Sequence, residues 1–168
     1  MAEIWLADEA AQAASLQSPE FLQGARLDEP RWASFWRTLV LDTETQALKD
    51  DGGASAPECA KIYVLLKRRP ELALAAFRQR LSEDRAAVAG RYGIDRHTVG
   101  FSRDALYGFG EPPFDAVELL ALREPAAVES LLADRSFTSA LTARPYVHET
   151  YAFNFVARER WIIPPGQR

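Results

Sequence analysis

The alternation of apolar and polar positions after residue 58 predicts a strand followed by a long helix. The run KIYVLLK over Lys61–Lys67 is apolar on both alternations, as expected for a strand that is covered on both faces. Beyond Pro70, which suits the first turn of a helix, apolar residues recur at spacings of three, four and seven. They are Leu74, Phe77, Leu81 and Val88. Charged residues lie between them, so this pattern predicts an amphipathic helix with one buried face.

The rest of this region predicts three more strands and a second helix. We expect strands at His97–Leu106, Asp115–Leu122 and Thr150–Arg158, and a helix that opens at Pro125 and runs through Leu132. The element order from Lys61 is then β-α-β-β-α-β, the ferredoxin-like unit of the α+β class. Such a unit has the strand order 4-1-3-2 and both helices on one face of the sheet. Its other face is apolar and can pair with a second unit.

The N-terminal part of the chain is similar to its C-terminal part and indicates a degenerate internal repeat. The segment AEIWLADEAAQAASLQSPEF near the N-terminus parallels AVELLALREPAAVESLLADRSF, so that Glu3 aligns with Glu118 and Phe21 with Phe137. An internal repeat of this kind is informative about the architecture of the fold. It predicts a βαβ half-repeat at the N-terminus.

Within this half-repeat we expect a strand at Glu3–Leu6, a helix over Glu9–Leu16 with Asp8 as its N-cap, and a strand at Arg37–Ala47. The strand that separates these two strands in a complete unit is missing. Unpaired buried backbone groups cost about 1–3 kcal/mol each, so the gap between the strands has to be filled. The two strands close up, the half-repeat packs on the free face of the complete unit, or a homodimer completes it. A truncated copy or a mis-assigned chain start is a fourth possibility.

Composition shifts place the domain boundaries. We expect a partial half-repeat at 1–48, a linker at 49–57, a complete ferredoxin-like domain at 58–163 and a tail at 164–168. The linker reads KDDGGASAP, polar and containing two glycines, and the tail begins with Pro164 and Pro165.

The chain has 168 residues, a net charge of -4 and 48% hydrophobic residues, which is enough for a packed core. Its basic residues are scattered, which argues against a nucleic-acid partner. A single cysteine, Cys59, excludes an internal disulfide and fits a reducing cytoplasm. The acidic N-terminus does not match a signal peptide, and no apolar run approaches the roughly 20 residues of a membrane helix. We therefore expect a soluble, cytoplasmic protein with no membrane partner.

Two segments, KIYVLLKRRPELALAAFRQRL and PPFDAVELLAL, resemble the EthD-like family of the dimeric α/β barrel superfamily. Phe77 and Leu81 occupy the two aromatic positions of the family's first helix, and Pro113–Leu119 occupies its third-strand motif. The short segment DEPRW at 28–32 is similar to the one that precedes the family's last strand. Many members carry a histidine at the end of the first helix, where this chain has Arg85, so a proton-transfer role at that position does not carry over.

The resemblance implies a homodimer that binds a hydrophobic small molecule in a barrel cavity. It implies a cofactor-independent enzyme of the oxygenase, cyclase or dehydratase type, acting on an apolar or aromatic metabolite. The alternative is a non-catalytic accessory or binding protein with a degenerate active site. The missing histidine favours this alternative.

Three residues are candidates for acid–base chemistry. His97, at the start of a strand, could exchange protons near neutral pH. Glu118 lies mid-strand between apolar neighbours, where burial would raise the pKa of its carboxyl, and Glu3 is in the matching position of the half-repeat. Tyr63 is the third candidate. The competing interpretation is structural for each of them: a rim histidine, an ion-paired glutamate and a core tyrosine.

Four further residues are candidates for substrate binding: Tyr107, Tyr151, Asn154 and His148. The competing interpretation of the aromatic residues is again simple core packing. Neither H-x-x-H nor C-x-x-C occurs, so we expect no metal site, and GFGEPP lacks the spacing of a phosphate-binding loop. We expect no cofactor, although haem ligation by one of the two histidines stays open, because some relatives in the superfamily bind haem.

Overall fold

The computed structural model describes residues 3–34, 38–50 and 59–158. The chain divides into two compact units, Met1–Val40 and Leu41–Arg168, and each is described by itself. This division lies before the boundary expected after residue 48. The expected tail at 164–168 and most of the expected linker lie outside the described residues.

The first unit is helical. It contains α1 (Glu9–Gln17), a π-helical turn η1 (Phe21–Ala25) and α2 (Arg26–Trp32). The predicted N-cap is confirmed, since Asp8 accepts a hydrogen bond of 2.8 Å from the amide of Ala11. The strand predicted at Glu3–Leu6 is wrong, because the described residues 3–6 form no ladder, and Ile4 is 79% exposed. A run of four residues gains little as a strand unless a neighbour supplies hydrogen bonds.

The second unit alternates strands and helices. Its elements are β1 (Thr43–Asp50), β2 (Ala60–Arg68), α3 (Leu74–Arg85), α4 (Val88–Arg91), β3 (Arg96–Ser102), α5 (Asp104–Tyr107), β4 (Ala116–Leu122), α6 (Pro125–Ala133), α7 (Arg135–Thr142) and β5 (Val147–Arg158). The α+β class and the ferredoxin-like order of strands and helices predicted for this region are confirmed. The predicted strand from His97 is shorter than expected, since the chain turns into α5 after Ser102.

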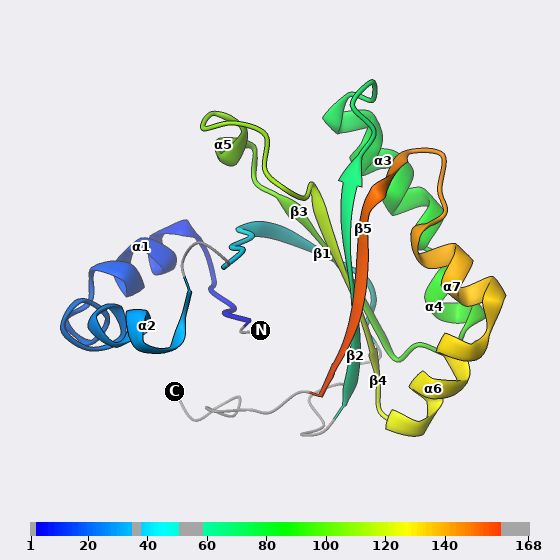
Figure 1. The fold of residues 1–168 in the computed structure, drawn as a ribbon, viewed down its shortest axis with the longest axis horizontal. Coiled ribbons are helices and arrows are strands. Elements are labelled where there is room, and N and C mark those ends of the chain that lie inside the picture. The colour runs from blue at the N-terminus through cyan, green and yellow to red at the C-terminus, as the bar shows by residue number, and fades with distance from the viewer. Residues whose placement is uncertain (1–2, 35–37, 51–58, 159–168) are drawn as a thin grey trace. The chain divides into compact units, whose positions relative to one another are not determined.

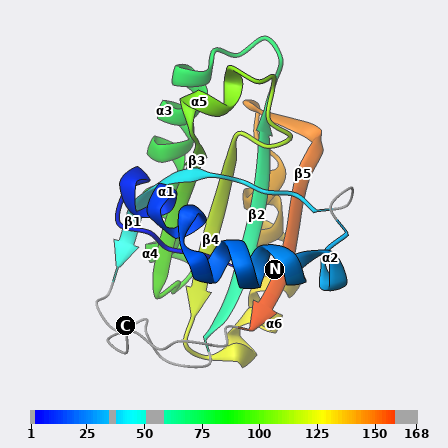
Figure 2. The same ribbon diagram turned by 90° about the vertical axis from the view of Figure 1, so that its left-hand side faces the viewer.

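The described strands form one antiparallel sheet in the order β1-β3-β4-β2-β5 (Figure 2). Without β1, this is the predicted 4-1-3-2 order. The strand expected at Arg37–Ala47 begins instead at Thr43, runs to Asp50 and pairs along β3, from Thr43 opposite Ser102 to Asp50 opposite Arg96. These residues therefore extend the sheet of the second unit, and no βαβ half-repeat forms in the described part of residues 3–50.

Four helices, α3, α4, α6 and α7, pack on the same face of the sheet, here called the helical face (Figure 1). The core between them is apolar. It contains Ile62, Val64, Leu66, Phe77, Leu81, Leu120, Phe137 and Leu141, all fully buried. The second predicted helix, from Pro125 through Leu132, corresponds to α6. The next helix, α7, was not predicted, and it begins after Asp134, whose carboxylate accepts a 2.7 Å hydrogen bond from the amide of Ser136. None of the described helices is long and apolar enough to cross a membrane.

The opposite face of the sheet, here called the aromatic face, carries the alternate residues of β2, β4 and β5. Its apolar cluster consists of Cys59, which precedes β2, and Tyr63, Val117, Leu119, Ala121, Phe155 and Ala157. Lys61 is buried on the same face. Tyr63 and Phe155 are cross-strand neighbours whose rings stack with centroids 5.0 Å apart. The alternation of side chains along a strand separates this cluster from the core on the helical face.

Candidate functional site

A cluster of charged side chains is buried on the helical face. Glu118 of β4 lies at its centre. The Nε of Arg85 donates a hydrogen bond to Oε1 of Glu118, and Nε2 of His97 lies 3.0 Å from the same oxygen. The Nη1 of Arg144 lies 3.9 Å from Oε2. The side chains of these four residues, here called the Glu118 cluster, are at most 4% exposed.

The sheet register and the helix period bring the cluster together. On β3, Val99 is opposite Glu118 and His97 is opposite Leu120, so His97 and Glu118 project from the same face. Arg85 follows Phe77 and Leu81 at helical spacing and continues the buried stripe of α3. The sequence pointed to His97 and Glu118 separately. It missed Arg85, although its place on the apolar stripe is a usable signal.

The carboxyl of Glu118 is ionised at neutral pH. Burial raises its pKa, but the hydrogen bond with His97 and the charges of Arg85 and Arg144 lower it by more. The pKa of Glu118 therefore lies below its usual value. The expectation of a raised pKa at Glu118 is wrong, because the sequence did not reveal the two buried arginines. A carboxylate in this state has no proton to donate as a general acid.

The two arginines of the cluster also cap the C-terminal end of α7. The carbonyl oxygen of Ala140 is among the last carbonyls of that helix, which have no partner within the helix. It accepts a 3.0 Å hydrogen bond from Nη1 of Arg85 and a 2.9 Å hydrogen bond from Nε of Arg144. Positive charge also suits the negative end of a helix dipole. This shared acceptor holds both guanidinium groups in place.

A groove of about 920 Å³ lies beside the cluster. Its lining comes from the end of α3, from α4, from α7 and from the loop before β5. The polar lining residues are Arg80, Glu83, Asp84, Arg85, Arg91 and Arg144; the others are Ala87, Val88, Tyr92, Ala140, Ala143, Pro145 and Tyr146. We call it the arginine groove.

Two tyrosines of the arginine groove are fixed by their neighbours. The ring of Tyr146 packs edge-on against Phe77, and its hydroxyl donates a 2.6 Å hydrogen bond to Asp84. Burial and this hydrogen bond raise the pKa of Tyr146 above its usual value, although Arg144 opposes the shift. The ring of Tyr92 packs edge-on against Phe137. The groove therefore has rigid aromatic walls above a buried, charged floor.

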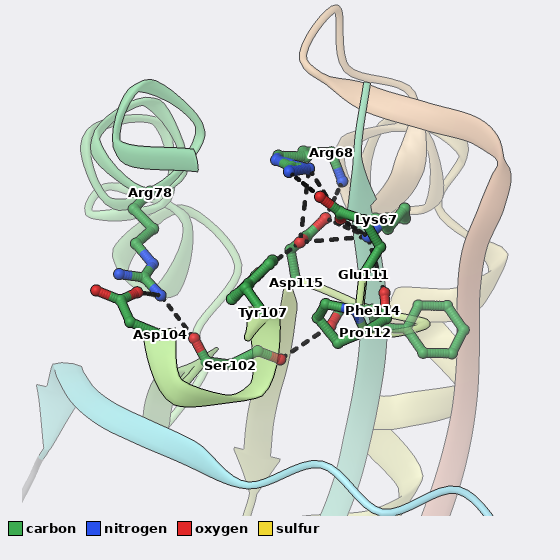
Figure 3. A network of polar contacts seen from close by, with 10 residues as sticks. All are labelled: Lys67, Arg68, Arg78, Ser102, Asp104, Tyr107, Glu111, Pro112, Phe114 and Asp115. Atoms are coloured by element: carbon green, nitrogen blue, oxygen red, sulfur yellow. Dashed lines mark hydrogen bonds and ion pairs between the residues drawn. The ribbon is translucent and has the colours of Figure 1, made fainter. Parts of the chain in front are cut away.

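A second polar network lies at one end of the sheet, where Figure 3 shows side chains converging on Asp115. The fully buried carboxylate of Asp115 accepts hydrogen bonds from the hydroxyl of Tyr107 at 2.5 Å and from the backbone amide of Arg68 at 2.8 Å. Lys67 lies 3.3 Å from it and also pairs with Glu111. Burial and the hydrogen bond to Asp115 raise the pKa of Tyr107. These contacts tie β2, β4 and α5 together.

The sequence-predicted site residues are dispersed. His97 and Glu118 meet in the buried cluster, while Tyr63 lies on the aromatic face. Tyr107 borders a small hollow of about 280 Å³ beside α5. His148 and Tyr151 contact each other at the start of β5, with ring centroids 4.9 Å apart, and Asn154 is exposed on that strand. None of these described residues lines the arginine groove.

Among the described residues, no group of three or more His, Cys, Asp and Glu side chains is placed to hold a metal ion. Cys59 is buried on the aromatic face.

No protein-family model matches the chain, and no curated protein matches it significantly. Two solved structures are similar. One is a dimeric protein of unknown function with a ferredoxin-like fold from Bacteroides fragilis, with 14% identity and a TM-score of 0.42 over 61% of this chain and 96% of that chain. The other is a mutant of SnoaB, a cofactor-independent oxygenase from Streptomyces nogalater, with 21% identity and a TM-score of 0.43 over 65% of this chain and 99% of that chain. The fold assignment above rests on the strand order of this chain itself.

Proposed function

We propose that the protein is an EthD-like protein that binds a small apolar or aromatic molecule in the arginine groove. The observation that carries this proposal is the groove itself, with its volume of about 920 Å³ and its two tyrosine walls. Small-molecule sites are usually concave, lined mainly by apolar and aromatic side chains, and supplied with a few fixed polar groups. The arginine groove is concave and has apolar and aromatic walls, and it carries more charge than most such sites, with six charged residues in its lining.

The walls of the groove are preorganised. Tyr92 and Tyr146 are each held by an aromatic neighbour and by a hydroxyl contact, to Ser136 at 3.3 Å and to Asp84 at 2.6 Å. A ligand therefore loses little affinity to the ordering of these side chains. Val88 and Pro145 add apolar surface between them.

Binding without catalysis fits the Glu118 cluster best. A catalytic acid or base has to come within hydrogen-bond reach of its substrate. Both Glu118 and His97 are fully buried, engage each other and stand behind the arginines that line the groove. The Glu118 cluster therefore has a structural role, since it holds the arginines of the groove in place.

One observation favours the enzymatic alternative, an oxygenase, cyclase or dehydratase. The Nδ1 atom of His97 is buried and has no hydrogen-bond partner among the described residues. An imidazole with one nitrogen on a carboxylate and the other unengaged is the arrangement of a general base. In this alternative, His97 carries the proton transfer, and the helices that bury it have to move apart to admit a substrate.

Fluorescence of N-phenylnaphthylamine, a neutral aromatic probe, tests the binding proposal. We expect saturable binding to the wild-type protein. The substitution Ala143→Trp fills the groove and should abolish binding, while Ala126→Trp, the same change on the exposed surface of α6, should leave it intact. Equal binding by Ala143→Trp and the wild-type protein would refute the groove as the site.

We also propose that the protein is a homodimer and that its β5 strands pair edge to edge. β5 is an edge strand of the described sheet. Tyr151 and Phe153 are each 51% exposed, and no charged residue occurs between Glu149 and Arg158. The opposite edge, β1, carries Glu44, Lys49 and Asp50, and charges on an edge discourage strand addition.

Light scattering tests the dimer. The wild-type protein should have the mass of two chains, and Phe153→Lys should reduce it to one. Phe109→Lys places the same charge on a residue that is 95% exposed in a turn, and it should not change the mass. A monomeric wild-type protein would exclude β5 pairing, and a dimer that survives Phe153→Lys would place the interface elsewhere.

A further inference from the structure

Arg85 has one guanidinium nitrogen that forms no hydrogen bond with any described residue, and the same holds for Oε2 of its partner Glu118. Its Nε is engaged by Glu118 and its Nη1 donates to the carbonyl of Ala140 at 3.0 Å. Its Nη2 is buried and has no hydrogen-bond partner among the described residues. The side chain is 1% exposed, yet it forms part of the lining of the arginine groove. A buried donor left unpaired in this way is unfavourable, and a partner that enters through the groove would satisfy it.

The charges around Arg85 do not balance. Two buried cations, Arg85 and Arg144, share one buried carboxylate, Glu118. The other carboxylate near Arg144 is Asp84, whose side chain is 53% exposed and also accepts a hydrogen bond from Tyr146. Asp84 lies 3.6 Å from Nε of Arg144 and pairs with it, so the excess of one positive charge belongs to the groove as a whole. Four arginines, Arg80, Arg85, Arg91 and Arg144, face the three carboxylates of Glu83, Asp84 and Glu118.

The exposed residues at the rim of the groove are already included in this count. Arg80 and Arg91 are exposed there, and so are the two carboxylates of Glu83 and Asp84. The groove consequently carries one net positive charge, and its two buried arginines are the cations that solvent screens least.

The geometry of the floor suits an oxyanion. Arg85 and Arg144 are both anchored on the carbonyl of Ala140, so their guanidinium planes are fixed before a ligand arrives. Guanidinium groups bind carboxylates, sulfonates and phosphates through paired, charge-assisted hydrogen bonds. The aromatic walls at Tyr92 and Tyr146 then contact the apolar body of the ligand.

We infer that the ligand of the arginine groove is an organic anion, with an aromatic or apolar body and an acidic group that Nη2 of Arg85 recognises. This inference rests on the proposed function and adds the charge of the ligand to it. The groove should therefore bind an acid more tightly than a neutral aromatic compound of the same shape.

Two probes with the same aromatic skeleton test the inference. Anilinonaphthalene sulfonate carries a sulfonate, and N-phenylnaphthylamine does not. We expect the sulfonate to bind the wild-type protein at least about tenfold more tightly, a difference of one order of magnitude in the dissociation constant. Ala143→Trp should abolish binding of both probes, and Ala126→Trp should not affect either.

Arg85→Lys keeps the positive charge beside Glu118 and removes the guanidinium fork. It should reduce sulfonate affinity about tenfold and leave affinity for the neutral probe unchanged. Equal affinity of the two probes for the wild-type protein would overturn the inference while leaving the groove as a neutral site. Failure of both probes at the groove would overturn the proposed function as well. The wild-type comparison decides the matter even where Arg85→Lys does not fold.

Discussion

Arg85 and Glu118 form an ion pair that is buried on both sides, with Nε of the arginine donating to Oε1 of the glutamate at the base of the helical face. The pair joins the last turn of α3 to the middle of β4. It also links the core to the arginine groove, because Arg85 belongs to the groove lining while Glu118 does not. Both charges are shielded from water, so each is stable in its buried position only when the other is present.

Removing the carboxylate should therefore destabilise the protein strongly. Glu118→Gln leaves Arg85 without its buried carboxylate partner, and breaking a buried pair in this way costs about 3–5 kcal/mol in the free energy of unfolding. Urea unfolding followed by circular dichroism measures it. Asp104→Asn removes the carboxylate of the more exposed Arg78 pair, 2.7 Å long, and should change stability by about 1 kcal/mol or less. Comparable losses of unfolding free energy in the two variants would show that burial does not determine how much the Arg85–Glu118 pair contributes to stability.

The stabilisation by Glu118 should depend on pH. Its pKa in the folded protein lies below the usual value of 4.5, so its contribution is fully present above that pH and is lost as the pH falls through the folded pKa. We expect the stability difference between the wild-type protein and Glu118→Gln to be constant near neutral pH and to shrink below about pH 4.5. Urea midpoints at several pH values measure it. A difference that persists unchanged in acid would contradict the lowered pKa.

The stabilisation that Tyr107 contributes should be lost at alkaline pH. Burial and the hydrogen bond to Asp115 raise the pKa of Tyr107, so its contribution to stability is complete below the usual phenol value and is lost as the pH rises through the raised pKa. Tyr107→Phe should cost about 1 kcal/mol near neutral pH and should weaken the alkaline loss. Tyr151→Phe removes the hydroxyl of a half-exposed tyrosine whose contact is a ring contact with His148, and it serves as the matched control.

Gly100 should be required for the attachment of β1. A β-carbon at this position would lie 2.8 Å from Oγ1 of Thr43 and 3.1 Å from a methyl of Val117. Gly100→Ala therefore forces β1 or β4 to shift, at a cost of about 1–3 kcal/mol. Gly90→Ala, where nothing lies within 4 Å, should be neutral or slightly stabilising. Hydrogen exchange of the β1 amides should become faster in Gly100→Ala alone.

Two deletions should behave differently. Removing residues 1–40 takes away the helical first unit and leaves every described strand in place. Removing residues 1–50 also takes away β1 and exposes the edge of β3, which is paired with it from Arg96 to Ser102. We expect the shorter deletion to unfold cooperatively and the longer one to be less stable and to aggregate. Equal melting temperatures would mean that β1 adds nothing to the sheet.

Periodicity was a good guide to the elements that bury one face or both. β2, β4 and α3 were located closely because their apolar residues repeat with the period of a strand or a helix, and the connectivity of these elements led to the sheet order. The N-terminal repeat was a poorer guide. Similarity to Ala116–Leu122 suggested a strand at Glu3–Leu6, but β4 is a strand because β2 and β3 flank it.

The candidate site was only partly accessible from sequence. Glu118 was singled out for its apolar neighbours and His97 as a histidine at the start of a strand, but their contact depends on the register of β3 against β4. Arg144 carried no signal, since it lies on the loop after α7 and reaches the cluster only when that helix has packed on the sheet.

The sequence by itself determined the repeating pattern of buried positions, and with it the α+β class and the ferredoxin-like order of the second unit, because side-chain periodicity is a local property. Only the tertiary structure decided the charge state of Glu118, the dispersal of the predicted site residues and the existence of the arginine groove. These depend on which side chains from distant segments share the same low-dielectric space, and electrostatic interactions there are set by distance and burial.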